Sequence, residues 1–146
     1  MLAYSFNMST KQTIVLQTIF AVSLAGMLGS LYFSEVMNFV PCMLCWYQRI
    51  ALYPIAFISF VALIRRDFSV WIYALVLAIV GALIALYQNM LIWGLIPESL
   101  KPCVEGVSCT TKYIEWLGFI TIPFLSLVAF CIIIALCVYL ARIRID

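Results

Sequence analysis

Four long apolar stretches, separated by short polar connections, dominate the pattern of this 146-residue chain. Each has roughly 18 or more residues and few charges, which is the length and composition of a helix that crosses a bilayer. The pattern predicts membrane-spanning helices over residues 13–33, 46–64, 68–93 and 116–140. We therefore expect an all-α membrane protein, a four-transmembrane-helix bundle in which residues 1–146 form a single integral membrane domain.

The composition agrees with this pattern. Hydrophobic residues make up 67% of the chain and charged residues only 10%, and the mean hydropathy is +1.19. A soluble domain carries roughly 25% charged residues, so no part of the chain is left for a separate soluble domain. The chain contains no histidine, which excludes imidazole as a general base, a haem ligand or a metal ligand.

The basic residues predict the orientation of the bundle. With four spans, one side of the membrane receives Lys11, Arg65, Arg66, Arg142 and Arg144. The positive-inside rule then places both termini in the cytoplasm and the connections at 34–45 and 95–115 outside. Cleavage of the first stretch as a signal peptide is the alternative, but the stretch is longer than a signal core and lacks a small-residue cleavage site.

Two cysteines stand at the start of the second predicted span, in the sequence PCMLCWYQR at 41–49. Cys42 and Cys45 have the spacing of a redox pair, and the positive end of a helix favours the thiolate form of both. Arg49 follows Cys45 by one helical turn and so lies on the same face. This cation favours a thiolate and can hydrogen-bond an anionic or carbonyl group beside the cysteine.

A second pair of cysteines, Cys103 and Cys109, lies in the one long connection, with Gly106 between them to let the loop fold back. A loop this long in a compact chain is usually functional or disordered. Both pairs fall on the outer side, where disulfides form and persist. Together they predict a relay, in which the loop pair meets a soluble partner and the pair at the helix start meets an electron acceptor in the membrane.

Redox energetics indicate the acceptor. A thioredoxin-like oxidant that introduces disulfides outside the cytoplasm has a potential near about −120 mV, whereas glutathione buffers are more reducing by tens of millivolts or more. A quinone in the bilayer fits, because it is apolar, takes two electrons and is regenerated by respiration. The sequence has no binding motif for flavin, haem or nucleotide, and we expect no nucleic-acid partner and no metal.

These motifs resemble the DsbB family of membrane disulfide oxidoreductases. The segment 41–49, followed by Tyr53-Pro54, is similar to the first redox loop of that family. The short loop 103–109 and the segments 113–116 and 120–124 resemble its BdbC branch in Gram-positive bacteria. The second loop is much shorter than in the Gram-negative members. The resemblance covers essentially the whole chain and implies a multi-pass protein of the bacterial cytoplasmic membrane.

The resemblance also implies a role for each site residue. Cys45 would face the quinone, with Arg49 as its electrostatic support, and Cys42 would exchange with the loop pair. Cys103 would be attacked by the partner's thiolate, and Cys109 would link back to Cys42. The partner would be a thioredoxin-like thiol oxidase of the DsbA or BdbD type, and the quinone would be menaquinone rather than ubiquinone. The protein would thereby support disulfide bond formation in secreted proteins.

Other interpretations remain open at this point. The four outer cysteines fit two structural disulfides in a non-catalytic scaffold, or a zinc site with less usual spacing. Within the enzyme class, a protein like vitamin K epoxide reductase shares the helical bundle and quinone-type chemistry. Arg49 can also reach lipid headgroups without any other role. Gln88 and Asn89 fit helix packing better than contact with a quinone, and Cys131 and Cys137 fit small apolar side chains of the last span.

Overall fold

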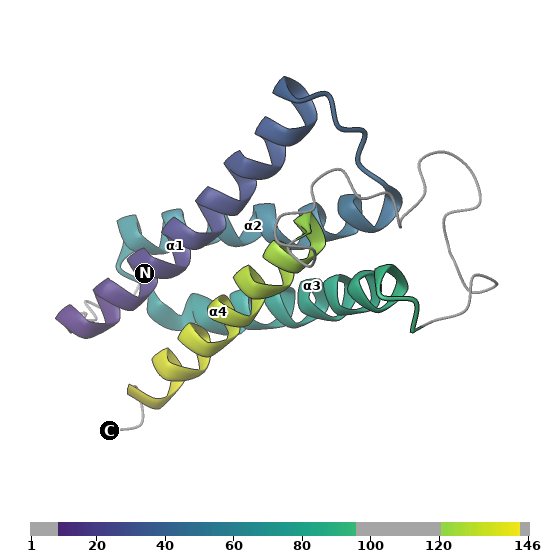
Figure 1. The fold of residues 1–146 in the computed structure, drawn as a ribbon. Coiled ribbons are helices and arrows are strands. Elements are labelled where there is room, and N and C mark those ends of the chain that lie inside the picture. The colour runs from purple at the N-terminus through teal and green to yellow at the C-terminus, as the bar shows by residue number, and fades with distance from the viewer. Residues whose placement is uncertain (1–8, 96–120, 144–146) are drawn as a thin grey trace.

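The computed structural model describes residues 9–95 and 121–143, and these form a bundle of four long helices (Figure 1). Their order is α1 (Thr10–Leu31), the π-helical turn η1 (Tyr32–Val36), α2 (Met43–Arg65), the 3-10 turn η2 (Phe68–Val70), α3 (Trp71–Ile92) and α4 (Ile122–Ile143). Each long helix is apolar enough to cross a membrane. At a rise of about 1.5 Å per residue, each also matches the roughly 30 Å of the hydrocarbon core. The predicted four-helix membrane bundle is confirmed.

The helix boundaries follow local capping rather than polarity. In α1, the side-chain Oε1 of Gln12 accepts a hydrogen bond of 3.1 Å from the backbone N–H of Ser9, which satisfies one donor at the helix start. Helix α2 begins at Met43 rather than at residue 46, because Pro41 and the extended Cys42 at the N-cap already set the entry of the chain. The first turn of α2 therefore includes Cys45. Residues 116–120 of the last predicted span lie outside the described residues.

A tight turn makes α2 and α3 antiparallel neighbours. Arg66 ends α2 in the left-handed conformation, with φ of 53°, and the N–H of Asp67 donates to the carbonyl of Ala62 over 3.0 Å. The carboxylate of Asp67 then accepts a hydrogen bond of 2.9 Å from the N–H of Ser69. This turn, the start of α1 and the end of α4 lie at one end of the bundle (Figure 1).

Close packing of α3 against α4 depends on small residues. Ala74, Ala78, Gly81 and Ala85 form one buried face of α3. A Cβ atom added at Gly81 would lie 2.2 Å from the ring of Phe130 on α4, which is fully buried. Such a face lets two helix backbones approach closely in a membrane, where packing rather than hydrophobicity drives association.

Two glycines on α1 serve different purposes. A Cβ atom at Gly26 would lie 2.8 Å from Leu52 of α2, so this glycine permits close packing. Gly29 has no atom within 4 Å of such a position, and it borders a cavity instead. The outside of the bundle carries exposed apolar side chains on all four helices, including Ile50, Tyr73 and Leu125, which suits a surface covered by lipid.

Candidate active site at the mouth of the bundle

The two cysteines of the second helix lie side by side at its first turn. Cys42 is the N-cap residue, and its carbonyl accepts the N–H of Trp46 over 3.1 Å, so the chain enters the helix directly at this thiol. The Sγ atoms of Cys42 and Cys45 are 3.2 Å apart, and both residues are free thiols. Cys42 is buried and Cys45 half-buried. The pair is thus a dithiol whose sulfur atoms are close enough to close into a disulfide after small side-chain rotations.

The two thiols differ in electrostatic environment. The hydrogen bond that Cys42 donates to Cys45, together with burial, raises the pKa of the Cys42 thiol. Burial and this hydrogen bond therefore favour the protonated form of Cys42, which acts as the donor to Cys45. The positive helix end favours a thiolate at both positions, and at Cys42 burial and the hydrogen bond to Cys45 oppose it.

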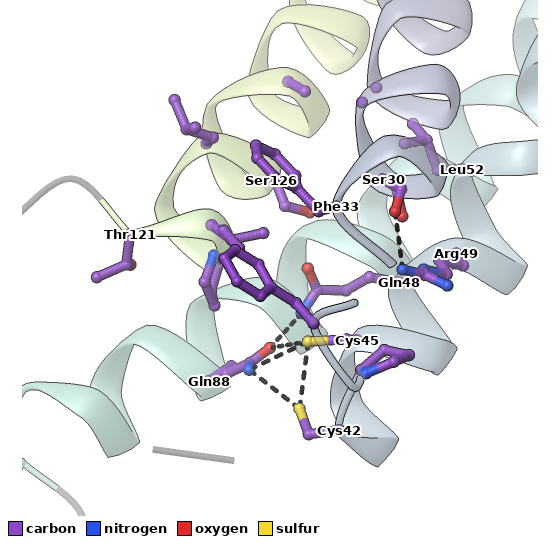
Figure 2. A pocket seen from close by; sticks show the side chains of 18 of the residues that line it. Ser30, Phe33, Cys42, Cys45, Gln48, Arg49, Leu52, Gln88, Thr121 and Ser126 are labelled. Carbon is purple, nitrogen blue, oxygen red and sulfur yellow. Dashed lines mark hydrogen bonds between the residues drawn. The ribbon is translucent and has the colours of Figure 1, made fainter. Parts of the chain in front are cut away.

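Two buried glutamines connect this pair to α3. Gln88 of α3 directs its Nε2 toward both sulfur atoms, at 3.3 Å from Cys42 and 3.6 Å from Cys45 (Figure 2). Its Oε1 accepts a hydrogen bond of 2.7 Å from Nε2 of Gln48 on α2. Both amides are buried, with 2% of Gln88 and 6% of Gln48 exposed. An amide buried at this depth needs hydrogen-bond partners, and here the two amides bond to each other while Gln88 also bonds to the dithiol.

Arg49 is held between α1 and its own helix. One guanidinium nitrogen donates to the carbonyl of Ser30 over 3.0 Å, and the guanidinium lies 5.4 Å from the ring centre of Trp46. Tyr53, one turn further along α2, places its hydroxyl 3.4 Å from the hydroxyl of Ser30. The cation is therefore fixed beside the redox pair by a backbone carbonyl and an aromatic face, rather than extended freely into the headgroup region.

Cys42, Cys45 and Arg49 all line one cavity of about 290 Å³ (Figure 2). Its walls come from α1, the connection before α2, and the facing parts of α2, α3 and α4, and they are mostly apolar; they include Gly26, Phe33, Leu52, Ile92, Leu125 and Ala129. A mostly apolar cavity with a few polar groups is the usual form of a small-molecule site. The sequence predicted that Arg49 and Cys45 share a helical face, and the structure places both at this cavity.

The remaining cysteines separate into two groups. Cys103 and Cys109 lie outside the described residues, so their predicted roles stay predictions. On α4, Cys137 is fully buried within the apolar core and Cys131 is exposed on the outside of the bundle. Both positions fit small apolar side chains, as expected from the sequence. Over residues 9–95 and 121–143, no cluster of three or more potential ligands could hold a metal ion.

The sequence pattern alone does not single out Gln48, and for Gln88 it favours helix packing over contact with a quinone. The signal was present, because polar side chains within membrane spans are costly and usually face a partner or a functional site. Which partner they face depends on how α2 and α3 are aligned, and that alignment has no simple signature in the sequence. The contact of Gln88 with the dithiol is therefore a finding of the structure.

A reactive dithiol at one end of a membrane helix bundle is the central feature of membrane thiol–disulfide oxidoreductases, and similar proteins give the same class. The family model "Disulfide bond formation protein DsbB" matches residues 12–140. The chain therefore belongs to the DsbB family and is a disulfide oxidoreductase of the cytoplasmic membrane.

Several curated proteins are similar to the chain over most of its length. "Disulfide bond formation protein C" of Bacillus subtilis is 51% identical over 115 residues, which cover 77% of this chain and 82% of that protein. "Probable disulfide formation protein C 1" of Bacillus anthracis is 42% identical over 130 residues, covering 89% and 93%. "Probable disulfide formation protein" of Metapseudomonas resinovorans is 40% identical over 122 residues, covering 83% and 85%. No solved structure matches the chain.

Proposed function

We propose that this protein oxidises a thioredoxin-like thiol oxidase outside the cytoplasm and passes the electrons to a membrane quinone, which we take to be menaquinone. The observation that carries the proposal is the shared cavity. Cys45 and Arg49 line the same mostly apolar space within a membrane bundle. An electron acceptor that lives in lipid could meet the dithiol there without the protein opening to water.

The residues around the cavity fit a quinone headgroup. A quinone ring is apolar with two carbonyl acceptors, and the cavity is mostly apolar with few donors. The guanidinium of Arg49 has five N–H donors, one of which meets Ser30, so it is suited to bind a carbonyl oxygen. When bound, the quinone would supply the chemistry of a two-electron, two-proton acceptor. The chain's own part is to bring the thiolate of Cys45 to the cavity and to keep a cation beside it.

The complete reaction balances as thiol–disulfide exchange followed by transfer to the acceptor. The partner's two thiols would reduce a Cys103–Cys109 disulfide, and that pair would in turn reduce the disulfide of Cys42 and Cys45. Two electrons then leave the Cys42–Cys45 pair as it returns to a disulfide. The proton of the Cys42 thiol, and the proton released when Cys45 became a thiolate, supply the two protons that convert quinone to quinol. In the thiol–disulfide exchange, we propose that the partner's thiolate attacks Cys103. Cys109 then forms a mixed disulfide with Cys42.

We further propose that both termini face the cytoplasm and that the dithiol faces outward. Among the described residues, four cations stand at the start of α1, at the end of α2 and at the end of α4: Lys11, Arg65, Arg66 and Arg142. These helix ends lie opposite the start of α2, which carries the dithiol (Figure 1). The positive-inside rule places such an end in the cytoplasm. The partner would then be met in the oxidising compartment, where its own disulfide is needed.

Membrane vesicles of defined orientation test the function and the orientation together. A reduced thioredoxin-like protein, which cannot cross the membrane, is added to right-side-out or inverted vesicles that contain menaquinone. We expect its oxidation only in right-side-out vesicles, and loss of that oxidation in the variant Cys45→Ser. Cys131→Ser is the matched control, because it removes a sulfur atom from the lipid-facing side of α4. Oxidation by Cys45→Ser at the parent rate would contradict the function, and oxidation only in inverted vesicles would contradict the orientation.

A further inference from the structure

Which end of the Gln88 amide faces the dithiol, the NH₂ group or the oxygen, determines whether it donates or accepts hydrogen bonds there. A glutamine side chain can present either its NH₂ group or its oxygen to a neighbour. Here Nε2 of Gln88 lies 3.3 Å from Sγ of Cys42 and 3.6 Å from Sγ of Cys45, and Oε1 lies further away, at 4.0 Å from Cys45. The group nearer to the sulfur atoms is therefore the donor.

Gln48 is the partner of Gln88 in this orientation. Its Nε2 donates to Oε1 of Gln88 over 2.7 Å, so the oxygen of Gln88 is already used on the side of α2. If Gln88 alone were turned over, two NH₂ groups would face each other and the hydrogen bond between the two buried amides would be lost. The orientations of Gln48 and Gln88, which lie on α2 and α3, are thus coupled, and in the structure the N–H groups of Gln88 point at sulfur.

An N–H group aimed at sulfur does not affect the two redox states equally. A thiolate is a strong hydrogen-bond acceptor because it carries charge, whereas the sulfur atoms of a disulfide are weak acceptors. A buried N–H donor therefore stabilises the reduced pair more than the oxidised pair. Stabilisation of the reduced form is what makes a disulfide a stronger oxidant.

We propose that Gln88 is a catalytic residue of the redox pair and that Gln48 is its positioning residue. Together they stabilise the reduced Cys42–Cys45 pair and so raise the oxidising strength of its disulfide. This inference rests on the proposed function for its purpose, since a strongly oxidising pair is needed to oxidise a thiol oxidase. Its physical content, the redox equilibrium of the pair, can be measured without any quinone.

The test is the equilibrium of the full-length purified protein with glutathione. Two glutathione thiols reduce the Cys42–Cys45 disulfide to the dithiol and become one glutathione disulfide, and the peptide that carries both cysteines is quantified after alkylation. In Gln88→Met, which loses the donor at similar volume, we expect the equilibrium constant for reduction to fall about tenfold, the effect of one hydrogen bond to a charged group. Tenfold corresponds to about 30 mV for this two-electron couple.

Gln48→Glu tests the orientation itself. At a pH that ionises it, a carboxylate only accepts hydrogen bonds, so Gln88 would turn its NH₂ group toward position 48 and its oxygen toward sulfur. We expect the equilibrium constant for reduction by glutathione to fall as much as in Gln88→Met, although the shape of the side chain at position 48 is almost unchanged. If the buried charge of Gln48→Glu prevents folding, Gln48→Met removes the donor to Gln88 without adding a charge. It should also lower the equilibrium constant for reduction.

Asn89→Leu is the matched control. Asn89 is the neighbouring buried amide of α3, but its Nδ2 donates to the carbonyls of Ala85 and Pro123, at 2.7 Å and 3.1 Å. Its loss should lower thermal stability and leave the glutathione equilibrium unchanged. The proposal is overturned when Gln88→Met and the folded Gln48 variant keep the parent constant within about twofold, or when Asn89→Leu shifts it equally. Failure of the parent protein to reduce quinone would contradict the proposed function, but it would not change the effect of the Gln88 and Gln48 variants on the glutathione equilibrium.

Discussion

At the scale of single residues, the site depends on side chains that meet from different helices. Arg49 is the clearest case, because its guanidinium is held by the carbonyl of Ser30 on α1 and by the ring of Trp46 on α2. A planar guanidinium can keep these contacts and still offer N–H groups to the cavity, whereas an ammonium has a compact charge and only three donors. The fixed position of this cation is what the proposed quinone site requires.

Substitution of Arg49 should therefore act on quinone affinity. In Arg49→Leu we expect the KM for a soluble quinone analogue to rise about tenfold or more, since a charge-assisted hydrogen bond is lost. Arg49→Lys keeps the charge but not the planar fork, and its KM should lie between those of the parent and Arg49→Leu. Steady-state quinone reduction with excess reduced partner gives both values. An unchanged KM in Arg49→Leu would mean that the cation does not bind the acceptor.

At the scale of helices, close approach at a few small residues sets how the bundle packs. The ring of Phe130 occupies the space that a side chain at position 81 would need, so α3 and α4 come together only because Gly81 has no Cβ atom. Gln88 lies two turns further along α3, on the same buried face. The packing of α3 thus helps to place Gln88 beside the dithiol.

Gly81→Ala should accordingly destabilise the bundle. The added Cβ atom would clash with Phe130, and overpacking of this kind costs about 1–3 kcal/mol. The double variant Gly81→Ala with Phe130→Leu should recover part of the loss, since the shorter side chain vacates the clash. Gly29→Ala is the control, because nothing lies within 4 Å of its Cβ position. The midpoint of thermal unfolding in detergent is measured for the parent and these three variants. Equal midpoints for Gly81→Ala and the parent would show that Gly81 is not needed for the packing of α3 on α4.

Helices are also the level at which the sequence was most informative. Apolar stretches with few charges predicted the four-helix bundle, because the bilayer permits few other structures. The start of α2 was less predictable, since hydropathy marks the apolar belt from residue 46 whereas the extended N-cap at Cys42 starts the helix at Met43. The redox spacing of the two cysteines and the position of Arg49 one turn later are local, and so both could be predicted.

Contacts between helices could not be predicted in this way. The pairing of Gln48 with Gln88, the carbonyl of Ser30 as the partner of Arg49, and the fit of Phe130 on Gly81 each depend on how two helices are aligned. A single sequence gives the face on which a residue lies, but not the residue opposite. Polar residues in apolar spans indicated where to look, and the structure supplied the partner.

At the scale of the whole molecule, the bundle separates two environments. The start of α2, with its dithiol, and the far end of α3 lie at one end, whereas most cations of the described residues lie at the other (Figure 1). Between them, the cavity brings the dithiol into contact with a mostly apolar space inside the membrane-spanning part of the protein. This arrangement suits a protein that accepts electrons from water-soluble thiols and releases them into the lipid phase.

The most direct test of this account isolates the last transfer. A variant with Cys103→Ala and Cys109→Ala retains only the Cys42–Cys45 pair as a proposed redox pair. The purified variant is reduced, freed of reductant and mixed without oxygen with a soluble menaquinone analogue. We predict that the dithiol becomes a disulfide and that one quinone is reduced for each protein molecule. Persistence of the dithiol, with the quinone still oxidised, would contradict the claim that these two cysteines deliver electrons to the membrane acceptor.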